Sequence, residues 1–308
     1  MSNHQDPPRG RALAIALLLV TVVLWGGTYV VTKNGVEEIP PMLFALLRFG
    51  VASLVLVPLA LLRGGMTRLP RPTPWRTLLL MGLTGVGLYY TGFNLALTYT
   101  TASQGALVQS SIPAITAIMA ALWLQERLSA QRIVGIVLAV AGVLLIVART
   151  SPDASARSPL IGNLLMFGTV LVWGIYTILA KRVADVDVIA ITACVAVIGT
   201  IVLIPAALLE GAYTEWPSIS GASWLGIIYL GALASALGYL LYGRALRELD
   251  ASLVGTFVNL APVIGVVSGV VLLGEAIAPI AILGGVLVLA GVWMSSRQPT
   301  SRGQASAG

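Results

Sequence analysis

The chain has 308 residues, of which 57% are hydrophobic and 10% are charged, and its mean hydropathy is +0.94. A soluble domain carries about 25% charged residues, so this composition excludes a soluble globular protein and indicates a polytopic membrane protein. The net charge of +6 is spread thinly over connections between apolar runs, which argues against nucleic acid as a partner.

Ten apolar runs follow one another along the chain, and most approach the roughly 20 residues that a helix needs to cross a bilayer. None shows the polar and apolar alternation of a membrane barrel strand. The fifth run is short, so Arg132 and Arg149 at its ends would have to reach outward to the interface. The predicted helices are Ala12–Thr32, Pro41–Leu62, Thr77–Thr98, Ser103–Leu124, Ile133–Ala148, Leu160–Ala180, Val188–Leu209, Ala222–Gly243, Ala251–Leu273 and Ile277–Ser295. We therefore expect an all-α polytopic membrane protein with ten transmembrane helices.

The second half of the chain repeats the first at an offset of 149 residues. Pro113 then meets Pro262, Glu126 meets Glu275, and two pairs of glycines coincide in the same register. Apolar composition alone would rarely align such different residues, so the pattern indicates a tandem duplication. We expect one five-helix repeat in residues 1–150 and a second in residues 151–308. Because five is odd, the two repeats would be inverted relative to each other, as in many transporters.

The basic residues predict how the chain lies in the membrane. Fourteen of the 18 lysines and arginines fall at the two ends of the chain and in the even-numbered connections, whereas three fall in the odd-numbered ones. Basic residues accumulate in cytoplasmic loops. Both termini are therefore expected in the cytoplasm, and the Arg149–Pro159 connection between the repeats is expected outside.

The content of cysteine and histidine limits the chemistry that the helices can perform. Cys194 is the single cysteine and His4 the single histidine, so an intrachain disulfide, a cysteine–histidine metal site and a nucleophile–histidine pair are all excluded. We expect no metal, no cofactor and no enzymatic activity.

Polar and amphipathic aromatic side chains gather in the first, third and fourth predicted helices and in their repeat partners. Tyr90 and Asn94, for example, are four residues apart and share one helix face. Such groups can join helices by hydrogen bonds, and this interpretation is favoured for single serines and threonines. For the clusters of rings and amides we expect the lining of a wet cavity. The candidate cavity residues are Trp25, Tyr29, Arg48, Tyr90, Asn94, Gln109, Trp173, Tyr176, Tyr239, Tyr242 and Asn259.

The fifth and tenth predicted helices are almost entirely apolar and carry small residues at helical spacing. These are Gly135, Ala139 and Gly142 in the fifth helix and Ala281, Gly285 and Gly291 in the tenth. Small residues allow close helix packing in membranes. The two helices are therefore expected to be packing struts or a dimer surface, and a monomer is favoured slightly over an oligomer.

Several motifs carry a resemblance to a known family. The stretch WGGTYVVTK beginning at Trp25, the pair of prolines beginning at Pro40, and the repeated segments around Pro113 and Pro262 resemble the EamA branch of the drug/metabolite transporter superfamily. The resemblance covers about residues 12–295 and extends to YddG-type exporters of aromatic amino acids. It implies ten helices in the inner membrane and export of amino acids or other metabolites. The family motifs fall on Trp25, Gly26, Lys33, Arg48, Pro113, Glu126, Gly135, Pro262, Glu275 and Gly284.

Arg48 is the one formal charge inside a predicted span, and Val195 stands at the corresponding place of the second repeat. Burial of an arginine in a membrane costs about 3 kcal/mol on insertion scales, so Arg48 is expected to face protein or water. It could brace the fold or reach a substrate carboxylate. Glu126 and Glu275 each follow the end of a helix, and a structural role is expected for both.

Three classes of function compete: a small-molecule exporter, a membrane enzyme and a channel. An enzyme would need convergent carboxylates, histidine or cysteine, and a channel would show rings of charge or a carbonyl filter. The inverted repeat favours an exporter, with the lipid bilayer and a small solute as its partners. Rings, amides and one arginine suit a neutral or zwitterionic solute such as an amino acid. An organic cation held by ring faces and a nucleotide sugar are the alternatives.

Pro113 and Pro262 are predicted to act as paired hinges, because proline interrupts the hydrogen bonds of a helix. Trp25, Tyr29, Tyr90 and Asn94 would form one gate toward the outside. Trp173, Tyr176, Tyr239 and Tyr242 would form the other gate, toward the cytoplasm.

Overall fold

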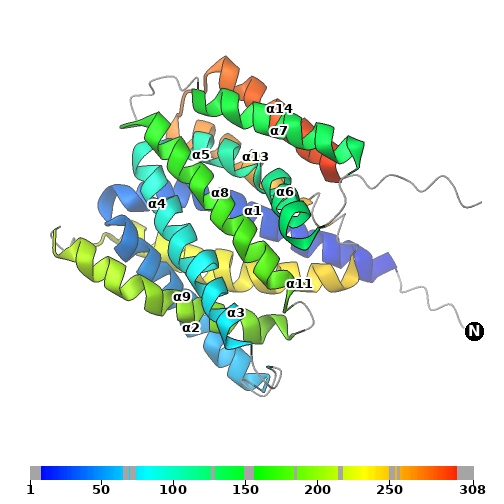
Figure 1. The fold of residues 1–308 in the computed structure, drawn as a ribbon. Helices are drawn as coiled ribbons and strands as arrows, with labels where there is room; N and C mark the ends of the chain where they lie inside the picture. The colour runs from blue at the N-terminus through cyan, green and yellow to red at the C-terminus, as the bar shows by residue number, and fades with distance from the viewer. Residues whose placement is uncertain are drawn as a thin grey trace, which may run out of the picture.

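A computed structural model describes residues 8–64, 69, 74–125, 129–148, 156–183, 186–213, 218–249, 254 and 257–296. Every regular element within these residues is a helix. In chain order the elements are α1 (Pro8–Glu38), α2 (Pro41–Leu62), α3 (Trp75–Gly82), η2 (Leu83–Leu88), α4 (Tyr89–Tyr99), α5 (Ala102–Gln109), α6 (Ile112–Leu124), α7 (Ala130–Ala148), α8 (Pro159–Lys181), α9 (Val188–Gly211), α10 (Gly221–Ile228), η3 (Tyr229–Leu237), α11 (Gly238–Glu248), α13 (Leu260–Leu273) and α14 (Pro279–Ser296). Figure 1 shows how they pack together.

Seven helices in these described ranges are long and apolar enough to cross a membrane. Four are the single helices α1, α2, α8 and α9, and three combine consecutive elements over Trp75–Tyr99, Ala102–Trp123 and Gly221–Tyr242. Three further apolar helices, Ala130–Ile146, Leu260–Leu273 and Pro279–Ser295, are shorter. The chain is an α-helical, polytopic membrane protein.

Helix α1 continues beyond the predicted end at Thr32 and stops only at Glu38. Lys33, which lies in this extra part, is 4% exposed and donates from Nζ to the carbonyl of Leu97 at 2.9 Å and to that of Thr100 at 3.2 Å. The charge is thus stabilised by carbonyls at the end of α4. Because protein groups satisfy Lys33, the helix can continue through a residue that hydropathy alone treats as a boundary.

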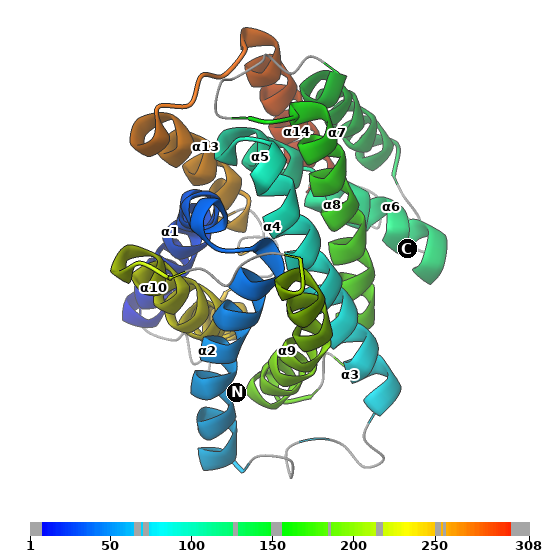
Figure 2. The ribbon, with the colours of Figure 1, turned by 90° about the vertical axis from the view of Figure 1, so that its left-hand side faces the viewer.

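The apolar helices α7 and α14 lie side by side at one edge of the molecule, as Figures 1 and 2 show. Their backbones touch at glycines. A Cβ atom on Gly142 would lie 2.4 Å from the carbonyl oxygen of Gly284, and a Cβ atom on Gly135 would lie 2.5 Å from that of Gly291. The two helices therefore pack against each other within the chain through their glycine faces, as expected for packing struts.

Three local features recur at the 149-residue offset between the halves. A π-helical segment interrupts both the Trp75–Tyr99 helix, as η2, and the Gly221–Tyr242 helix, as η3. A turn at Ser110 and another at Asn259 precede α6 and α13. Gln125 and Gly274, which end these two helices, both have left-handed backbone conformations.

Two carboxylates, Glu210 and the buried Glu275, join helix ends that are distant in sequence. Glu210, near the end of α9, accepts hydrogen bonds from two backbone N–H groups at the start of α2, at 2.8 and 3.0 Å. Glu275, which follows α13, accepts from two at the start of α5, at 2.6 and 2.7 Å. Each carboxylate satisfies N–H groups that a helix leaves open and also interacts with the positive end of its dipole.

Candidate functional site

A cavity of about 180 Å³ lies in the middle of the helix bundle. An engineered cavity of about 150 Å³ holds a benzene molecule, so this one has room for an aromatic ring. Most of its lining is aromatic or apolar, with a few hydroxyl and amide groups and one guanidinium. The lining residues are Trp25, Thr28, Tyr29, Arg48, Tyr89, Tyr90, Phe93, Gln109, Ser110, Ile112, Pro113, Trp173, Ala234, Tyr239, Val258, Asn259, Ala261 and Pro262.

Two broken helices contribute to the cavity at equivalent places in the two halves. The turn at Ser110 separates α5 from α6, and the turn at Asn259 precedes α13. Pro113 and Pro262 each lie in the first turn of the helix that follows. A proline cannot donate the backbone hydrogen bond that would continue the preceding helix, whereas it is well tolerated in a first turn. The two prolines therefore lie at the starts of α6 and α13, beside the cavity, and not in the middle of continuous helices.

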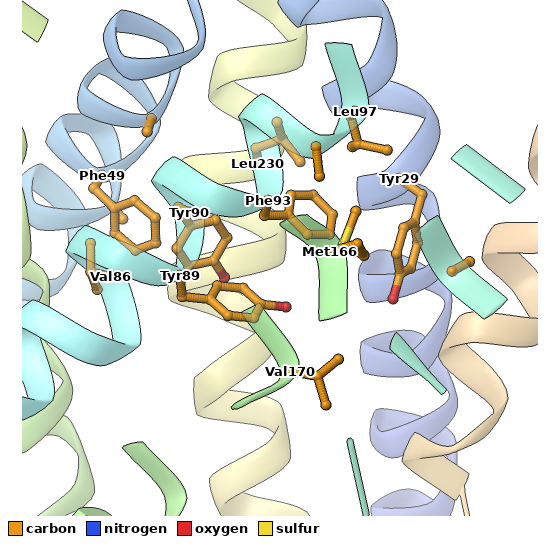
Figure 3. Close-up of a cluster of buried hydrophobic side chains, with 14 of the residues drawn as sticks. Tyr29, Phe49, Val86, Tyr89, Tyr90, Phe93, Leu97, Met166, Val170 and Leu230 are labelled. Carbon is orange, nitrogen blue, oxygen red and sulfur yellow. The ribbon is translucent and has the colours of Figure 1, made fainter. Parts of the chain in front are cut away.

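Helix α4 supplies three rings that start directly after the π-helical segment η2. Tyr89, Tyr90 and Phe93 project between Tyr29 on α1 and Phe49 on α2, as Figure 3 shows. The Tyr89 and Tyr90 ring centroids are 4.8 Å apart, and the Phe49 and Tyr90 centroids are 4.5 Å apart. These spacings are typical of edge-to-face and tilted aromatic contacts, which fix ring orientation. The cavity therefore has an aromatic wall of rings in contact with one another.

The second π-helical segment, η3, holds the side chain of Trp25. The Trp25 indole Nε1 donates to the carbonyl oxygen of Ala234 at 2.9 Å. Its ring centroid lies 5.8 Å from that of Tyr239 and 5.4 Å from that of Tyr242. A π-helical turn changes the register of the backbone hydrogen bonds and is frequent at functional sites. In this structure it places a backbone carbonyl where the half-buried indole N–H needs an acceptor.

Gln109 at the end of α5 connects three helices around the cavity. Its Oε1 accepts from the Tyr89 hydroxyl at 3.2 Å, and its Nε2 donates to the Thr169 hydroxyl on α8 at 2.8 Å. Both the carbonyl oxygen and the NH2 group of this buried amide therefore have hydrogen-bond partners, as burial requires. The arrangement positions Tyr89 against Trp173, whose ring centroid is 4.8 Å away.

Arg48 projects from α2 into the same lining and is 3% exposed. Its Nε and Nη2 each donate to the Ser235 hydroxyl on η3 at 3.3 Å. Its Cζ atom lies 4.4 Å from the centroid of the Tyr90 ring, within the range of a cation–π contact. The guanidinium is thus held by neutral groups on two neighbouring elements.

Eight of the predicted cavity residues and both predicted hinge prolines belong to this one lining. The eight residues are Trp25, Tyr29, Arg48, Tyr90, Gln109, Trp173, Tyr239 and Asn259. Tyr176 instead lines a small neighbouring cavity of about 20 Å³, and Tyr242 packs behind Trp25. The structure also places rings from the two expected gates in direct contact, because Trp25 meets Tyr239. The two gates themselves stay a prediction, although the packing of α1 against α11 brings one ring of each set into contact.

Asn94 lies away from the cavity lining. It is fully buried, and its Nδ2 donates to the carbonyl oxygen of Pro41 at 2.9 Å. It shares a helix face with Tyr90 but is one turn closer to the end of α4, where that face meets the start of α2. Asn94 therefore braces a helix junction, which the i, i+4 spacing alone does not reveal.

The family follows from comparison with known sequences. The sequence profile of the EamA-like transporter family matches residues 12–148 and matches again over residues 160–297. The chain belongs to the EamA-like transporter family. The resemblance indicated by the motifs is therefore confirmed, and two copies of the EamA profile together cover most of the chain.

Relatives of this EamA-like transporter match it over nearly their whole lengths. An uncharacterised transporter of Archaeoglobus fulgidus is 29% identical over 91% of this chain and 96% of its own. A probable amino-acid metabolite efflux pump of Salmonella typhimurium is 30% identical over 91% and 93%. A probable terminal-alkyne amino-acid exporter of Streptantibioticus cattleyicolor is 28% identical over 94% and 95%. A solved crystal structure at 22% identity shares the fold, with a TM-score of 0.63 over 92% of this chain and 96% of the other.

Some lining residues of the EamA-like transporter were not among the sequence-predicted candidates. Tyr89 and Phe93 are the clearest, since both contribute rings to the wall shown in Figure 3. Phe93 lies three residues after Tyr90 and four after Tyr89, so helical spacing could have found it. Thr28 and Ser110 give no such signal, because single hydroxyl residues in membrane helices usually bond to the backbone, as both do here.

Of the two glutamates in the family motifs, the structure describes the contacts of Glu275 alone. Glu275 caps the start of α5, as described above, and this contact matches the structural role expected for it. Glu126, its partner in the first half, lies outside the described residues.

Proposed function

We propose that this EamA-like transporter exports small neutral or zwitterionic metabolites, most specifically amino acids of aromatic or medium size. Ten helices in two inverted halves, residues 1–150 and 151–308, would surround one solute site. The protein would lie in the inner membrane with both termini in the cytoplasm. The site would alternate between the two sides of the membrane, and the chain would perform transport without a covalent reaction.

The observation that carries this proposal is the position of the cavity between two broken helices. Secondary transporters bind their substrates near the middle of the membrane, where discontinuous helices from two repeats meet. In this chain the turns at Ser110 and Asn259 both border the cavity, and a proline follows each. The two turns are repeat-equivalent, so movement at both could open the cavity first to one side and then to the other.

The lining supports the substrate class. Trp25, Tyr90 and Trp173 offer ring faces, and Asn259 offers an amide. Pockets of this kind bind a largely apolar ligand and orient it through a few polar groups. The printed descriptions of two relatives, an amino-acid metabolite efflux pump and an amino-acid exporter, support the same class.

The two alternatives are less consistent with the cavity. A nucleotide sugar carries at least two phosphate charges and would need several basic groups, yet Arg48 is the only basic side chain in the described lining. An organic cation could stack on the rings by cation–π attraction, but Arg48 would repel it. The described lining contains no carboxylate that could relay protons, so we propose transport down the solute gradient.

Uptake into proteoliposomes tests the proposal. Purified protein should take up labelled phenylalanine, threonine or methionine without an imposed proton gradient. Trp173→Ala, which removes a ring of the cavity lining, should lower the rate at least tenfold. Trp224→Ala removes a tryptophan that is 42% exposed on α10, outside the cavity, and should leave the rate unchanged. Failure with all three amino acids, together with uptake of a phosphorylated sugar or a cationic dye, would refute the assignment.

A further inference from the structure

Arg48 is the only formally charged side chain among the described residues that line the cavity. A buried guanidinium in a membrane needs partners that replace water, and its cost falls when those partners are negatively charged. The groups around Arg48 therefore indicate what kind of solute the cavity stabilises.

The hydrogen-bond partners of Arg48 are neutral and distant. The contacts from Nε and Nη2 to Ser235 are 3.3 Å long, and Nη2 is 3.5 Å from the Tyr90 hydroxyl oxygen. Nη1 is buried and has no hydrogen-bond partner among the described residues. Hydrogen bonds from a guanidinium to a carboxylate are shorter, about 2.7–2.9 Å, and about twice as strong. Arg48 therefore retains the capacity to bind a carboxylate.

The described carboxylates of the chain are all engaged elsewhere. Glu37 pairs with Lys33 and Glu248 with Arg244. Glu38 caps the start of α10, and Asp187 caps the start of α9. Glu210 caps the start of α2, and Glu275 caps the start of α5. Within the described part of the chain, the positive charge in the cavity has no protein counter-charge.

We propose that Arg48 binds the carboxylate of the transported solute through Nη1. The cavity then selects monocarboxylates whose aromatic or apolar body packs against the rings of α1, α4 and α8. This inference rests on the proposed function, since it assigns the anchor within the same cavity. The solute carboxylate supplies the negative charge that the described lining lacks.

The same lining treats the α-ammonium group of an amino acid differently. Its described acceptors are neutral, such as the Asn259 amide and the hydroxyls of Thr28 and Ser110. A positive charge on the solute is also repelled by Arg48. The amino group is therefore dispensable, and arylalkanoic acids bind as well as the corresponding amino acids. Amines that lack the carboxylate do not bind.

Three compounds with the same phenyl ring separate these contributions. Phenylalanine carries both charges, 3-phenylpropanoate carries only the carboxylate, and 2-phenylethylamine carries only the ammonium group. Binding to the purified, full-length protein is measured by calorimetry in detergent, so the result does not depend on transport. We expect 3-phenylpropanoate to bind within about threefold of phenylalanine. We expect 2-phenylethylamine to bind at least tenfold more weakly, because it forms no charge-assisted bond with Arg48.

Two variants test the anchor itself. Arg48→Gln should weaken the binding of both carboxylates about tenfold or more. Arg244→Gln removes an exposed arginine outside the cavity and should leave binding unchanged. The thermal unfolding of each variant is compared with that of the parent protein. If Arg48→Gln does not fold, the three compounds on the unmodified protein decide the question by themselves.

The outcomes distinguish this inference from the proposed function. Binding of 2-phenylethylamine as tight as that of 3-phenylpropanoate overturns the inference, as does phenylalanine binding with no binding of 3-phenylpropanoate. Carboxylate binding that a folded Arg48→Gln variant retains in full also overturns it. Arg48-dependent binding of 3-phenylpropanoate without transport of any amino acid supports the anchor and refutes only the proposed amino-acid export.

Discussion

Gln125 has a left-handed backbone conformation, with φ of 55°, and is the only non-glycine residue in the described ranges with a positive φ. It ends α6 in the position where Gly274 ends α13, with φ of 66°. A side chain makes this conformation unfavourable by about 1 kcal/mol, whereas glycine adopts it readily. The first half of the molecule therefore carries a local cost that the second half avoids.

Gln125→Gly is expected to stabilise the protein by up to about 1 kcal/mol. Thermal unfolding of the detergent-solubilised protein should show a higher midpoint. Ala121→Gly, one turn earlier in α6, is the matched control. It places glycine in a helical conformation and should lower stability by about 1 kcal/mol. If Gln125→Gly lowers the midpoint by as much as the control, the side chain of Gln125 contributes more than its backbone costs.

At the scale of elements, α7 and α14 depend on direct backbone contact. Gly142→Ala would place a Cβ atom 2.4 Å from the carbonyl oxygen of Gly284, so the two helices would have to separate. Overpacking of this kind costs about 1–3 kcal/mol, and we expect a lower unfolding midpoint. Gly168→Ala on α8 is the control, because a Cβ atom there meets no heavy atom within 4 Å. Equal effects of the two substitutions would argue against a tight α7–α14 contact.

The broken helices beside the cavity are the elements proposed to move. In place of Pro113 or Pro262, alanine could donate a backbone hydrogen bond and extend the preceding helix across the break. A proline inside a helix costs about 3 kcal/mol relative to alanine, so the substitution favours the continuous form. The Pro113→Ala, Pro262→Ala double variant is expected to keep solute binding but to transport at least tenfold more slowly in proteoliposomes. Normal transport rates in this variant would show that the prolines are not hinges.

At the scale of the whole molecule, the distribution of basic residues predicts the orientation. Both termini should lie in the cytoplasm and the connection between the halves outside, because basic loops remain on the cytoplasmic side. A cysteine at Ser155 should react with an impermeant thiol reagent on intact cells, in a background with Cys194 replaced. A cysteine at Ser2 should react only after the cells are opened. Both positions lie outside the described residues, and the reverse labelling pattern would invert the orientation.

The sequence by itself determined the class of the protein and the positions of its long apolar helices along the chain. Lipid offers no partners for backbone N–H and C=O groups, so each span must satisfy them within a helix. Apolar runs of sufficient length therefore predict helices directly, and all seven long apolar helices fall on predicted runs. The family motifs are equally local, and the profile match confirms the family that they indicate.

Only the tertiary structure decided which side chains meet. Helical spacing places Tyr90 and Asn94 on one face. It does not indicate that Tyr90 borders the cavity whereas Asn94 contacts the start of α2. The contact of Trp25 with Tyr239 and the pairing of Arg48 with Ser235 join residues about 200 positions apart. Such contacts depend on how helices are rotated and offset against each other. Packing of the whole bundle sets these quantities, because a uniformly apolar lipid surface leaves little periodicity in the sequence to indicate them.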